Sequence, residues 1–204
     1  MEHTPAHEEH RDDVADRMGM WLFIFTELLL FSGLFIVYAV FRAKYHNDFH
    51  IAGYQLNVFV GTINTVALLI SSATVAMSIT AVQKGDKKMA LILIGITLFL
   101  ATVFLINKYF EWGHKIHIGL YPGSEIMMSL QRGQSLFFGL YFFMTGLHAL
   151  HIIIGMTLLI IIMLQVNSGK INKTSYVFLE NGALYWHLVD LIWILLFPLL
   201  YLIA

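Results

Sequence analysis

Five long apolar runs separated by short polar segments constrain this 204-residue chain more than any other feature of its sequence. Each run is long enough to cross a hydrocarbon layer of about 30 Å as an α-helix. The sequence is 58% hydrophobic and 12% charged, against about 25% charged residues in soluble domains. The pattern predicts an all-α fold, a polytopic transmembrane bundle of five helices over residues 19–204. The predicted spans are about 19–42, 57–83, 89–112, 134–165 and 178–203.

A polar tail, residues 1–18, precedes the first run and holds six of the thirteen acidic residues. It lacks the basic start and short apolar core of a secretory signal, so we expect the first span to be retained. His3, His7 and His10 in this tail have helical spacing, but a solvated acidic segment is a more common use of such a sequence than a cation site. The segments between the runs carry helix breakers or turn residues, as in KGDKK at 84–88.

Several classes of function are excluded by composition and missing motifs. The absence of cysteine excludes thiolate metal sites, iron-sulfur clusters, c-type haem attachment and disulfides. The net charge of −1 gives no electrostatic basis for binding nucleic acid. The sequence also has no glycine-rich phosphate loop, serine elbow or HExxH pattern.

Positive charge at alternate ends of the spans predicts the orientation in the membrane, because Lys and Arg are enriched on the cytoplasmic side. One side has seven such residues and the other five. The seven are Arg11, Arg17, Lys84, Lys87, Lys88, Lys170 and Lys173, and the five are Arg42, Lys44, Lys108, Lys115 and Arg132. We therefore expect a cytoplasmic N-terminus and a periplasmic C-terminus. No internal repeat is evident, which disfavours an inverted-repeat transporter.

Ionisable residues inside apolar spans each cost a few kcal/mol near the helix centre, so they are expected to have a structural or functional role. Glu27 lies in FTELLLF, about 12 Å into the first span. Either it contacts a proton path or a lipid, or it is a neutral acid hydrogen-bonded to a neighbouring helix.

Two histidines, His148 and His151, lie three residues apart in TGLHALHIIIG of the fourth span. One helix would place both on the same side of a metal, so hydrogen bonds across packed helices are favoured over haem or metal ligation. Gly139, Gly146 and Gly155 on this span would permit the required close approach.

Glu180, His187 and Asp190 lie on one stripe of the fifth span, LENGALYWHLVDLIW, which is expected to face protein rather than lipid. The i, i+3 spacing of His187 and Asp190 allows them to pair directly. Otherwise each is expected to bond a polar group on an adjacent helix. Lys108 and Glu111 have the same spacing at the end of the third span, where an ion pair near the membrane interface is expected.

These segments together resemble subunit III of the haem-copper respiratory oxidases over about residues 18–203. The first two segments, MGMWLFIFTELLLFSGLF and INTVALLISSATVAMSITAVQKGDKK, are less specific than TGLHALHIIIG followed by ENGALYWHLVDLIW. The resemblance implies a bacterial plasma-membrane subunit without haem, copper or other metal, beside a catalytic subunit I that holds the haems and copper, and a subunit II. It also implies bound phospholipid and support of proton uptake and of the catalytic subunit's stability during turnover.

The resemblance is closest to the five-span form that lacks the first two of seven helices. Quinol oxidase members of similar length generally lack acids at the positions of Glu27 and Glu180, so their presence here resembles an aa3-type cytochrome c oxidase. A quinol oxidase subunit and an accessory subunit of a nitric oxide reductase are the related alternatives.

Two hypotheses come from other classes. The first is a small proton channel or transporter whose path is formed by Glu27, His148, His151, His187 and Asp190. The second is a membrane cytochrome with haem on His148 or His151. Small residues of the second span favour the first two spans as the surface that docks the catalytic subunit, with lipid between the subunits. These residues are Gly61, Ser71, Ser72, Ala73, Ala76 and Ser78. Their alternative role is packing within the chain.

Overall fold

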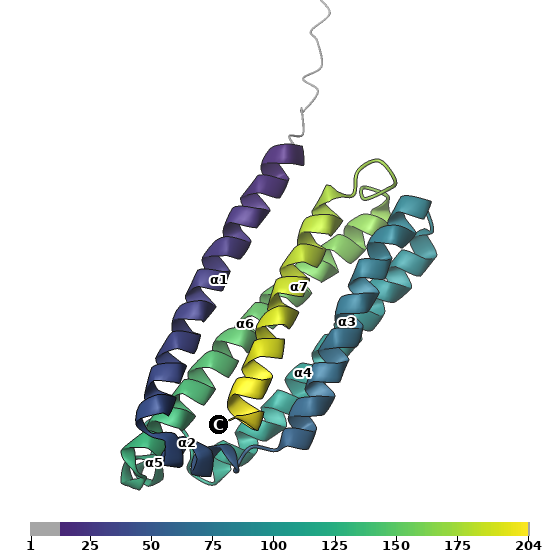
Figure 1. Cartoon of the computed structure of the whole chain (residues 1–204). Helices are drawn as coiled ribbons and strands as arrows, with labels where there is room; N and C mark the ends of the chain where they lie inside the picture. The colour runs from purple at the N-terminus through teal and green to yellow at the C-terminus, as the bar shows by residue number, and fades with distance from the viewer. Residues whose placement is uncertain (1–12, 204) are drawn as a thin grey trace, which may run out of the picture.

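The computed structural model describes residues 13–203, which form five long helices, two short helices and a final π-helical turn (Figure 1). The long helices are α1 (Asp13–Lys44), α3 (Val58–Lys84), α4 (Lys87–His117), α6 (Arg132–Ser168) and α7 (Val177–Phe197). The short helices are α2 (His46–Gly53) and α5 (Glu125–Ser129), and α7 continues into η1 (Pro198–Leu202). Because residues 13–203 contain no β-strand, the predicted all-α fold is confirmed.

Five helices are long and apolar enough to cross a membrane, one for each predicted span. Several extend beyond the predicted limits: α1 begins at Asp13 rather than near residue 19, and α4 continues to His117 rather than about 112. A 31-residue helix such as α4 is about 46 Å long, which exceeds the hydrocarbon thickness of about 30 Å. Its polar ends therefore reach past the hydrocarbon, where hydropathy alone gives no signal for helix.

The turn between α3 and α4 is made by the two residues that punctuate KGDKK. Gly85 adopts φ 79°, a left-handed conformation that ends α3 and favours glycine. Asp86 then accepts a hydrogen bond from the Met89 amide and caps α4. A two-residue connection makes α3 and α4 antiparallel neighbours, and their contact is the most extensive in the bundle.

The segment between the first two spans contains α2, although its turn residues favour a loop. Phe49 and Ala52 of this helix are buried, and the Asp48 carboxylate accepts a hydrogen bond from the Gly133 amide at the start of α6. Tertiary contacts with α6 therefore stabilise a helix too short to form by local propensity alone.

The bundle has α7 at its centre and α1 at one edge (Figure 1). In Figure 1, α3 and α4 lie on the side of α7 opposite α1, and α6 passes behind α7. α1 packs against α6 and α7 and is the least buried of the five long helices. The described chain begins at one end of the bundle and finishes at the other.

Only one of the three glycines expected to bring α6 close to another helix does so. A Cβ atom at Gly155 would lie 2.9 Å from the Trp186 ring of α7, whereas the nearest atoms at Gly139 and Gly146 are 3.9 Å away. Because Trp186 is fully buried, the ring has no space to move outwards. The α6–α7 contact therefore depends on Gly155.

Replacing Gly155 by leucine is expected to lower the free energy of unfolding by about 1–3 kcal/mol, because the side chain overpacks the α6–α7 contact. Thermal unfolding of the purified chain in detergent measures the effect. Gly95→Leu on α4 is the matched control, since nothing lies within 4 Å of its Cβ position. Equal unfolding temperatures for the two variants would contradict the assigned role of Gly155.

Candidate functional site: a membrane-buried polar network

Glu27 of α1 and His151 of α6 form a contact between two spans. The Glu27 Oε2 atom lies 3.0 Å from His151 Nε2, and the Glu27 side chain is 18% exposed. His151 Nδ1 lies 2.8 Å from the Leu147 carbonyl oxygen, so this nitrogen carries a proton and donates it. One further proton must then lie between Nε2 and the carboxyl, held by one or the other. The pair is an acid–base couple that shares a proton inside the membrane span.

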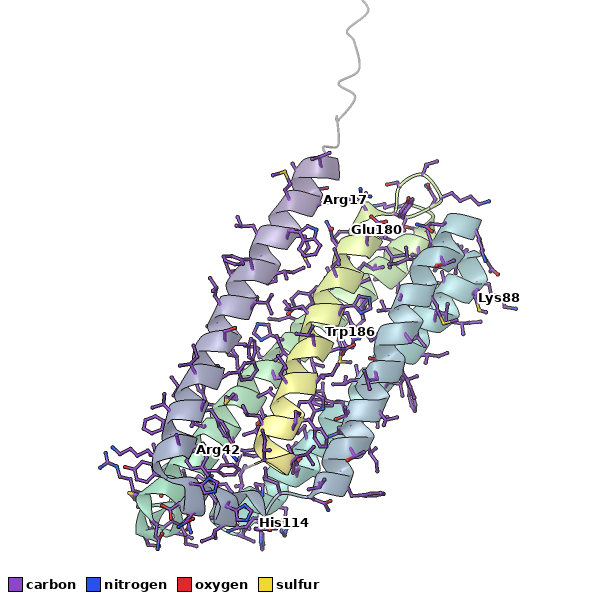
Figure 2. All side chains as sticks on the ribbon, in the orientation of Figure 1. Arg17, Arg42, Lys88, His114, Glu180 and Trp186 are labelled. Atoms are coloured by element: carbon purple, nitrogen blue, oxygen red, sulfur yellow. The ribbon has the colours of Figure 1, made fainter. Side chains whose placement is uncertain are left out.

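Glu180 lies in the first turn of α7, at the end away from η1, and pairs with Arg17 of α1. Its Oε2 atom accepts a hydrogen bond of 2.8 Å from Arg17, and both residues are labelled at the same end of the bundle in Figure 2. The next residue, Asn181, donates to the backbone oxygen of Asp16 at 3.3 Å. These two contacts hold the first turns of α1 and α7 together.

His187 and Asp190 do not pair with each other. His187 Nδ1 lies 2.6 Å from the Ser72 hydroxyl of α3, which meets the expectation of a partner on an adjacent helix. Asp190 is only 3% exposed and so faces protein, as predicted. Neither of its oxygens makes a hydrogen bond of normal geometry with a described residue, although the Ser72 hydroxyl lies close enough to interact with it. The three side chains form a cluster between α3 and α7.

His148 differs from His151, three residues away on the same helix. It is fully buried, and neither ring nitrogen has a hydrogen-bond partner among the described residues. Its ring instead stacks on Trp193 at 5.2 Å and meets the edge of Phe104 at 5.5 Å. The expected hydrogen bond across packed helices is therefore found for His151, and for His148 that expectation is wrong.

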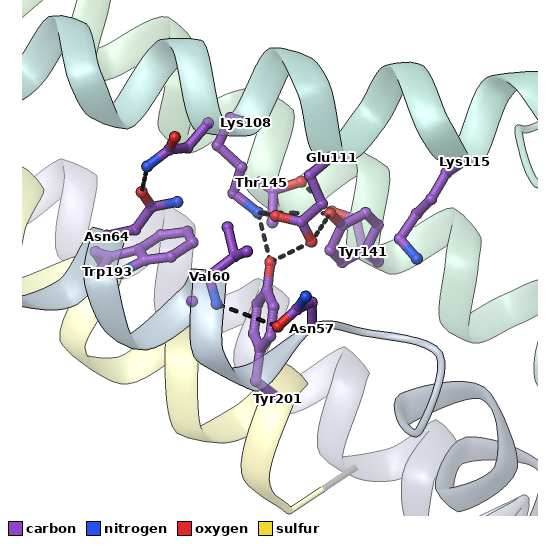
Figure 3. Close-up of polar contacts among 12 residues, drawn as sticks. Asn57, Val60, Asn64, Lys108, Glu111, Lys115, Tyr141, Thr145, Trp193 and Tyr201 are labelled. Atoms are coloured by element: carbon purple, nitrogen blue, oxygen red, sulfur yellow. Dashed lines mark hydrogen bonds and ion pairs between the residues drawn. The ribbon is translucent and has the colours of Figure 1, made fainter.

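A polar cluster surrounds Lys108 of α4 (Figure 3), and sequence reasoning predicted only one of its contacts, the pair of Lys108 with Glu111. The Lys108 ammonium lies 3.1 Å from Glu111 and donates to the Tyr201 hydroxyl of η1 at 2.6 Å and to the Tyr141 hydroxyl of α6 at 3.4 Å. Both tyrosine hydroxyls donate to one oxygen of Glu111 at 2.6 Å. Lys108 is 2% exposed and the Glu111 side chain 8%. The cluster therefore ties α4, α6 and η1 together in a desolvated environment.

Aromatic faces complete the surroundings of the Lys108 cation. Its ammonium lies 4.9 Å from the Trp193 ring centroid, 5.1 Å from that of Tyr141 and 5.2 Å from that of Tyr201. Ring faces attract cations more strongly where water is excluded. The i, i+3 spacing of Lys108 and Glu111 predicted their pairing, but it gave no indication of the two tyrosines, which come from distant parts of the sequence.

Two tryptophans of α7 donate hydrogen bonds to hydroxyls of α3. Trp186 Nε1 donates to Ser71 at 3.0 Å, and Trp193 Nε1 donates to Thr65 at 3.0 Å. α3 therefore presents a polar seam to α7 along much of the span. Within residues 13–203, no group of three or more His, Cys, Asp or Glu side chains is placed to hold a metal ion. His3, His7 and His10 lie outside the described residues.

The fold and these residues define a polytopic helical membrane protein with a buried polar network across its spans. The chain belongs to the family described as Cytochrome c oxidase subunit III, whose model matches residues 2–204. This membership agrees with the resemblance found in the sequence and favours it over the transporter and cytochrome hypotheses.

Individual relatives include oxidases of both donor classes. The chain is 29% identical to cytochrome c oxidase subunit 3 of Thermostichus vulcanus over 205 residues, covering 100% of this chain and 92% of that protein. It is 27% identical to cytochrome bo(3) ubiquinol oxidase subunit 3 of Pseudomonas aeruginosa, covering 100% and 90%. It is also 30% identical to a heme-copper oxidase subunit I+III of Aeropyrum pernix, covering 99% of this chain and 24% of that protein.

Breaking the Lys108–Glu111 pair from one side is expected to destabilise the chain strongly. Lys108→Met or Glu111→Leu alone should each lower the unfolding free energy by about 3–5 kcal/mol, because each leaves a buried charge without its partner. The double variant should cost much less than the sum of the two, since it removes both charges. Unfolding in detergent gives all three values.

Arg17→Met is the control for this double-mutant cycle, because the Arg17 side chain is 51% exposed and exposed ion pairs contribute only about 0–1 kcal/mol. Additive costs in the double variant, or single variants as stable as Arg17→Met, would disprove the assigned role of the pair.

Proposed function

We propose that this chain is the subunit III of an aa3-type cytochrome c oxidase that supports proton uptake and the stability of the catalytic subunit during electron transfer to oxygen. The residue contact that carries the proposal is Glu27–His151, a carboxyl and an imidazole that share a proton inside the membrane span. An acid–base couple of this kind can accept and release protons without a redox centre. Residues 19–204 would form the working transmembrane domain, preceded by the polar tail 1–18.

The assignment to a cytochrome c oxidase rests on Glu27 and Glu180. Each has a defined partner on another helix, His151 and Arg17 respectively, so each acid contributes a specific contact to this fold. The similarity to a ubiquinol oxidase subunit in Pseudomonas aeruginosa supports the alternative donor, quinol. Reduction of the purified complex by cytochrome c or by quinol distinguishes the two donors.

Proton-path or lipid-contact roles are proposed for Glu27, His151, Glu180, His187 and Asp190. His148 is a weaker candidate, because its ring is enclosed by Phe104 and Trp193. Haem and copper are assigned to the partner subunits, and phospholipid to the surface of this chain. The apolar exposed side chains of α1, such as Leu22, Phe25 and Leu29, are suited to contact acyl chains or an apolar partner.

The proposed partners are catalytic subunit I and subunit II. The relative from Aeropyrum pernix is named as a fusion of subunits I and III, which supports a direct contact with subunit I in this chain. Of the small residues considered for docking on α3, Gly61, Ser71 and Ser78 are buried inside the chain and Ser72 bonds His187. Ala73 and Ala76 are exposed and are proposed to contact subunit I, together with the outer face of α1.

We assign the chain to a bacterial plasma membrane, with a cytoplasmic N-terminus and a periplasmic C-terminus. Two of the five basic residues counted on the periplasmic side, Lys108 and Lys115, are buried within α4 at 2% and 3% exposure. They neutralise or contact groups in the bundle and so carry little topological weight. The remaining basic residues favour the cytoplasmic N-terminus more strongly.

Replacing Glu27 by Gln is expected to leave assembly of the oxidase intact, since the amide keeps the side chain's size and a hydrogen bond to His151. Sustained oxygen consumption by the purified complex should fall during continuous turnover, because the shared proton is lost. An oxygen electrode records both the initial rate and its decline.

Glu125→Gln on α5 is the matched control, because Glu125 is exposed and lies outside the long helices. Wild-type turnover in Glu27→Gln would assign the acid to packing alone. Failure of the complex to assemble would contradict both the packing role and the proton-supply role.

A further inference from the structure

A cavity of about 290 Å³ lies between α1, α3 and α7 at the end of the bundle that carries Arg17 and Glu180. Its lining includes Arg17, Trp21, Ile79, Glu180, Asn181 and His187. The Arg17 side chain is 51% exposed and that of Glu180 is 25% exposed, so this ion pair is at the open side of the cavity. Although much of the lining is apolar, Arg17, Glu180, Asn181 and His187 offer the two to four polar partners that a buried water molecule needs.

His187 forms the inner wall of this cavity. It lies seven residues beyond Glu180 along α7, which is about 10 Å deeper at 1.5 Å per residue. Its Nδ1 atom is 2.6 Å from the Ser72 hydroxyl of α3. The imidazole therefore connects the cavity with the interior of the α3–α7 contact.

Ser72 connects His187 with Asp190. Its hydroxyl lies 2.6 Å from the imidazole Nδ1 and faces the Asp190 carboxyl without a hydrogen bond to it in this structure. The Asp190 side chain is buried. Asp190 makes no hydrogen bond of normal geometry with a described residue, so its carboxyl has free capacity to accept one. A serine hydroxyl is both donor and acceptor and rotates, so it can bond either neighbour and pass a proton between them.

The connection stops beyond Asp190. One turn deeper, Trp193 is fully buried, and its ring lies 4.8 Å from Phe104 and 5.2 Å from His148. Its indole N–H donates to Thr65, and an indole nitrogen has no acceptor with which to relay a proton. The aromatic layer therefore separates Asp190 from the Lys108 cluster on the far side.

We propose that the cavity, His187, Ser72 and Asp190 form a blind-ended proton pathway in which Asp190 is the terminal proton-holding site. A hydronium ion in the cavity gives a proton to His187 Nε2, the Nδ1 proton passes to the Ser72 oxygen, and the Ser72 hydroxyl proton passes to the Asp190 carboxylate. The products are the neutral carboxylic acid and water, and the reverse sequence releases the proton on the same side. The inference rests on the proposed support of proton uptake and names a route and a store for it.

Hydrogen–deuterium exchange followed by infrared spectroscopy of the assembled, resting oxidase complex tests the pathway. The carboxylic acid C=O band of Asp190 should be absent in Asp190→Asn and displaced in Asp190→Glu. Ser72→Ala should keep the band but slow its exchange by about a hundredfold or more, because the positioned proton donor is lost. Leu184→Trp, which fills the cavity that Leu184 also lines, should slow the exchange as well.

Ser78→Ala is the matched control, because Ser78 is a buried serine of the same helix whose hydroxyl donates to its own Val75 carbonyl. Its exchange rate should equal that of the wild type. An unchanged rate in Ser72→Ala, or a wild-type spectrum in which neither Asp190 variant alters a carboxylic acid band, overturns the proposal. If Asp190→Asn does not assemble, Asp190→Glu supplies the band assignment.

The exchange is measured without turnover, so its outcome is independent of the Glu27→Gln result. The exchange could behave as expected while Asp190→Asn turns over as fast as the wild type. That result would keep the pathway but remove its link to proton uptake. If Asp190 does not exchange through Ser72 while Glu27→Gln still lowers sustained turnover, the pathway is disproved and the proposed function stands.

Discussion

The scarcity of water in the hydrocarbon layer is the constraint on which the structure depends, because a polar group there must be satisfied within protein. The helices satisfy their own backbones, so the remaining problem is the side chains. The chain solves it mainly at α7, whose two tryptophans donate to hydroxyls of α3 and whose His187 bonds the Ser72 hydroxyl of the same helix. Because lipid tails are as apolar as the helix surfaces, hydrophobic burial gives little preference for one neighbouring helix over another. Polar contacts therefore determine which helices are neighbours.

The two ends of the bundle use this constraint differently. At the end of α7 that leads into η1, the Lys108 cluster is closed, because each of its charges has several partners. At the other end, the Arg17–Glu180 pair is partly exposed and borders a cavity. The closed cluster is suited to hold helices together, and the open end is suited to exchange protons with water.

α1 is held less firmly than the other long helices, and this has consequences for assembly. Its specific polar ties are Glu27 with His151 and the contacts of Arg17 and Asp16 with the first turns of α7. Much of its apolar surface remains exposed. A partner subunit or lipid on this face would therefore influence the Glu27–His151 couple directly, which links docking to the proposed proton chemistry.

The sequence was sufficient to predict the five spans, because long hydrophobic runs identify membrane-spanning helices. It also predicted that Asp190 faces protein, since a charge facing lipid is too costly. It did not predict that His187 bonds Ser72 or that Tyr141 and Tyr201 converge on Glu111. Those contacts depend on the rotation of each helix about its axis, and the apolar residues that surround nearly every face of these helices leave that rotation undetermined.

We propose that this chain works as a non-redox subunit beside a haem-bearing catalytic subunit. Affinity purification of the tagged full chain from its native membrane, followed by identification of the accompanying chains and an absorption spectrum of each, tests it directly. We expect a larger haem-bearing chain in stoichiometric amount, with no haem absorption in this chain after the two are separated. Isolation of the folded chain alone, or a haem band belonging to this chain, would contradict it.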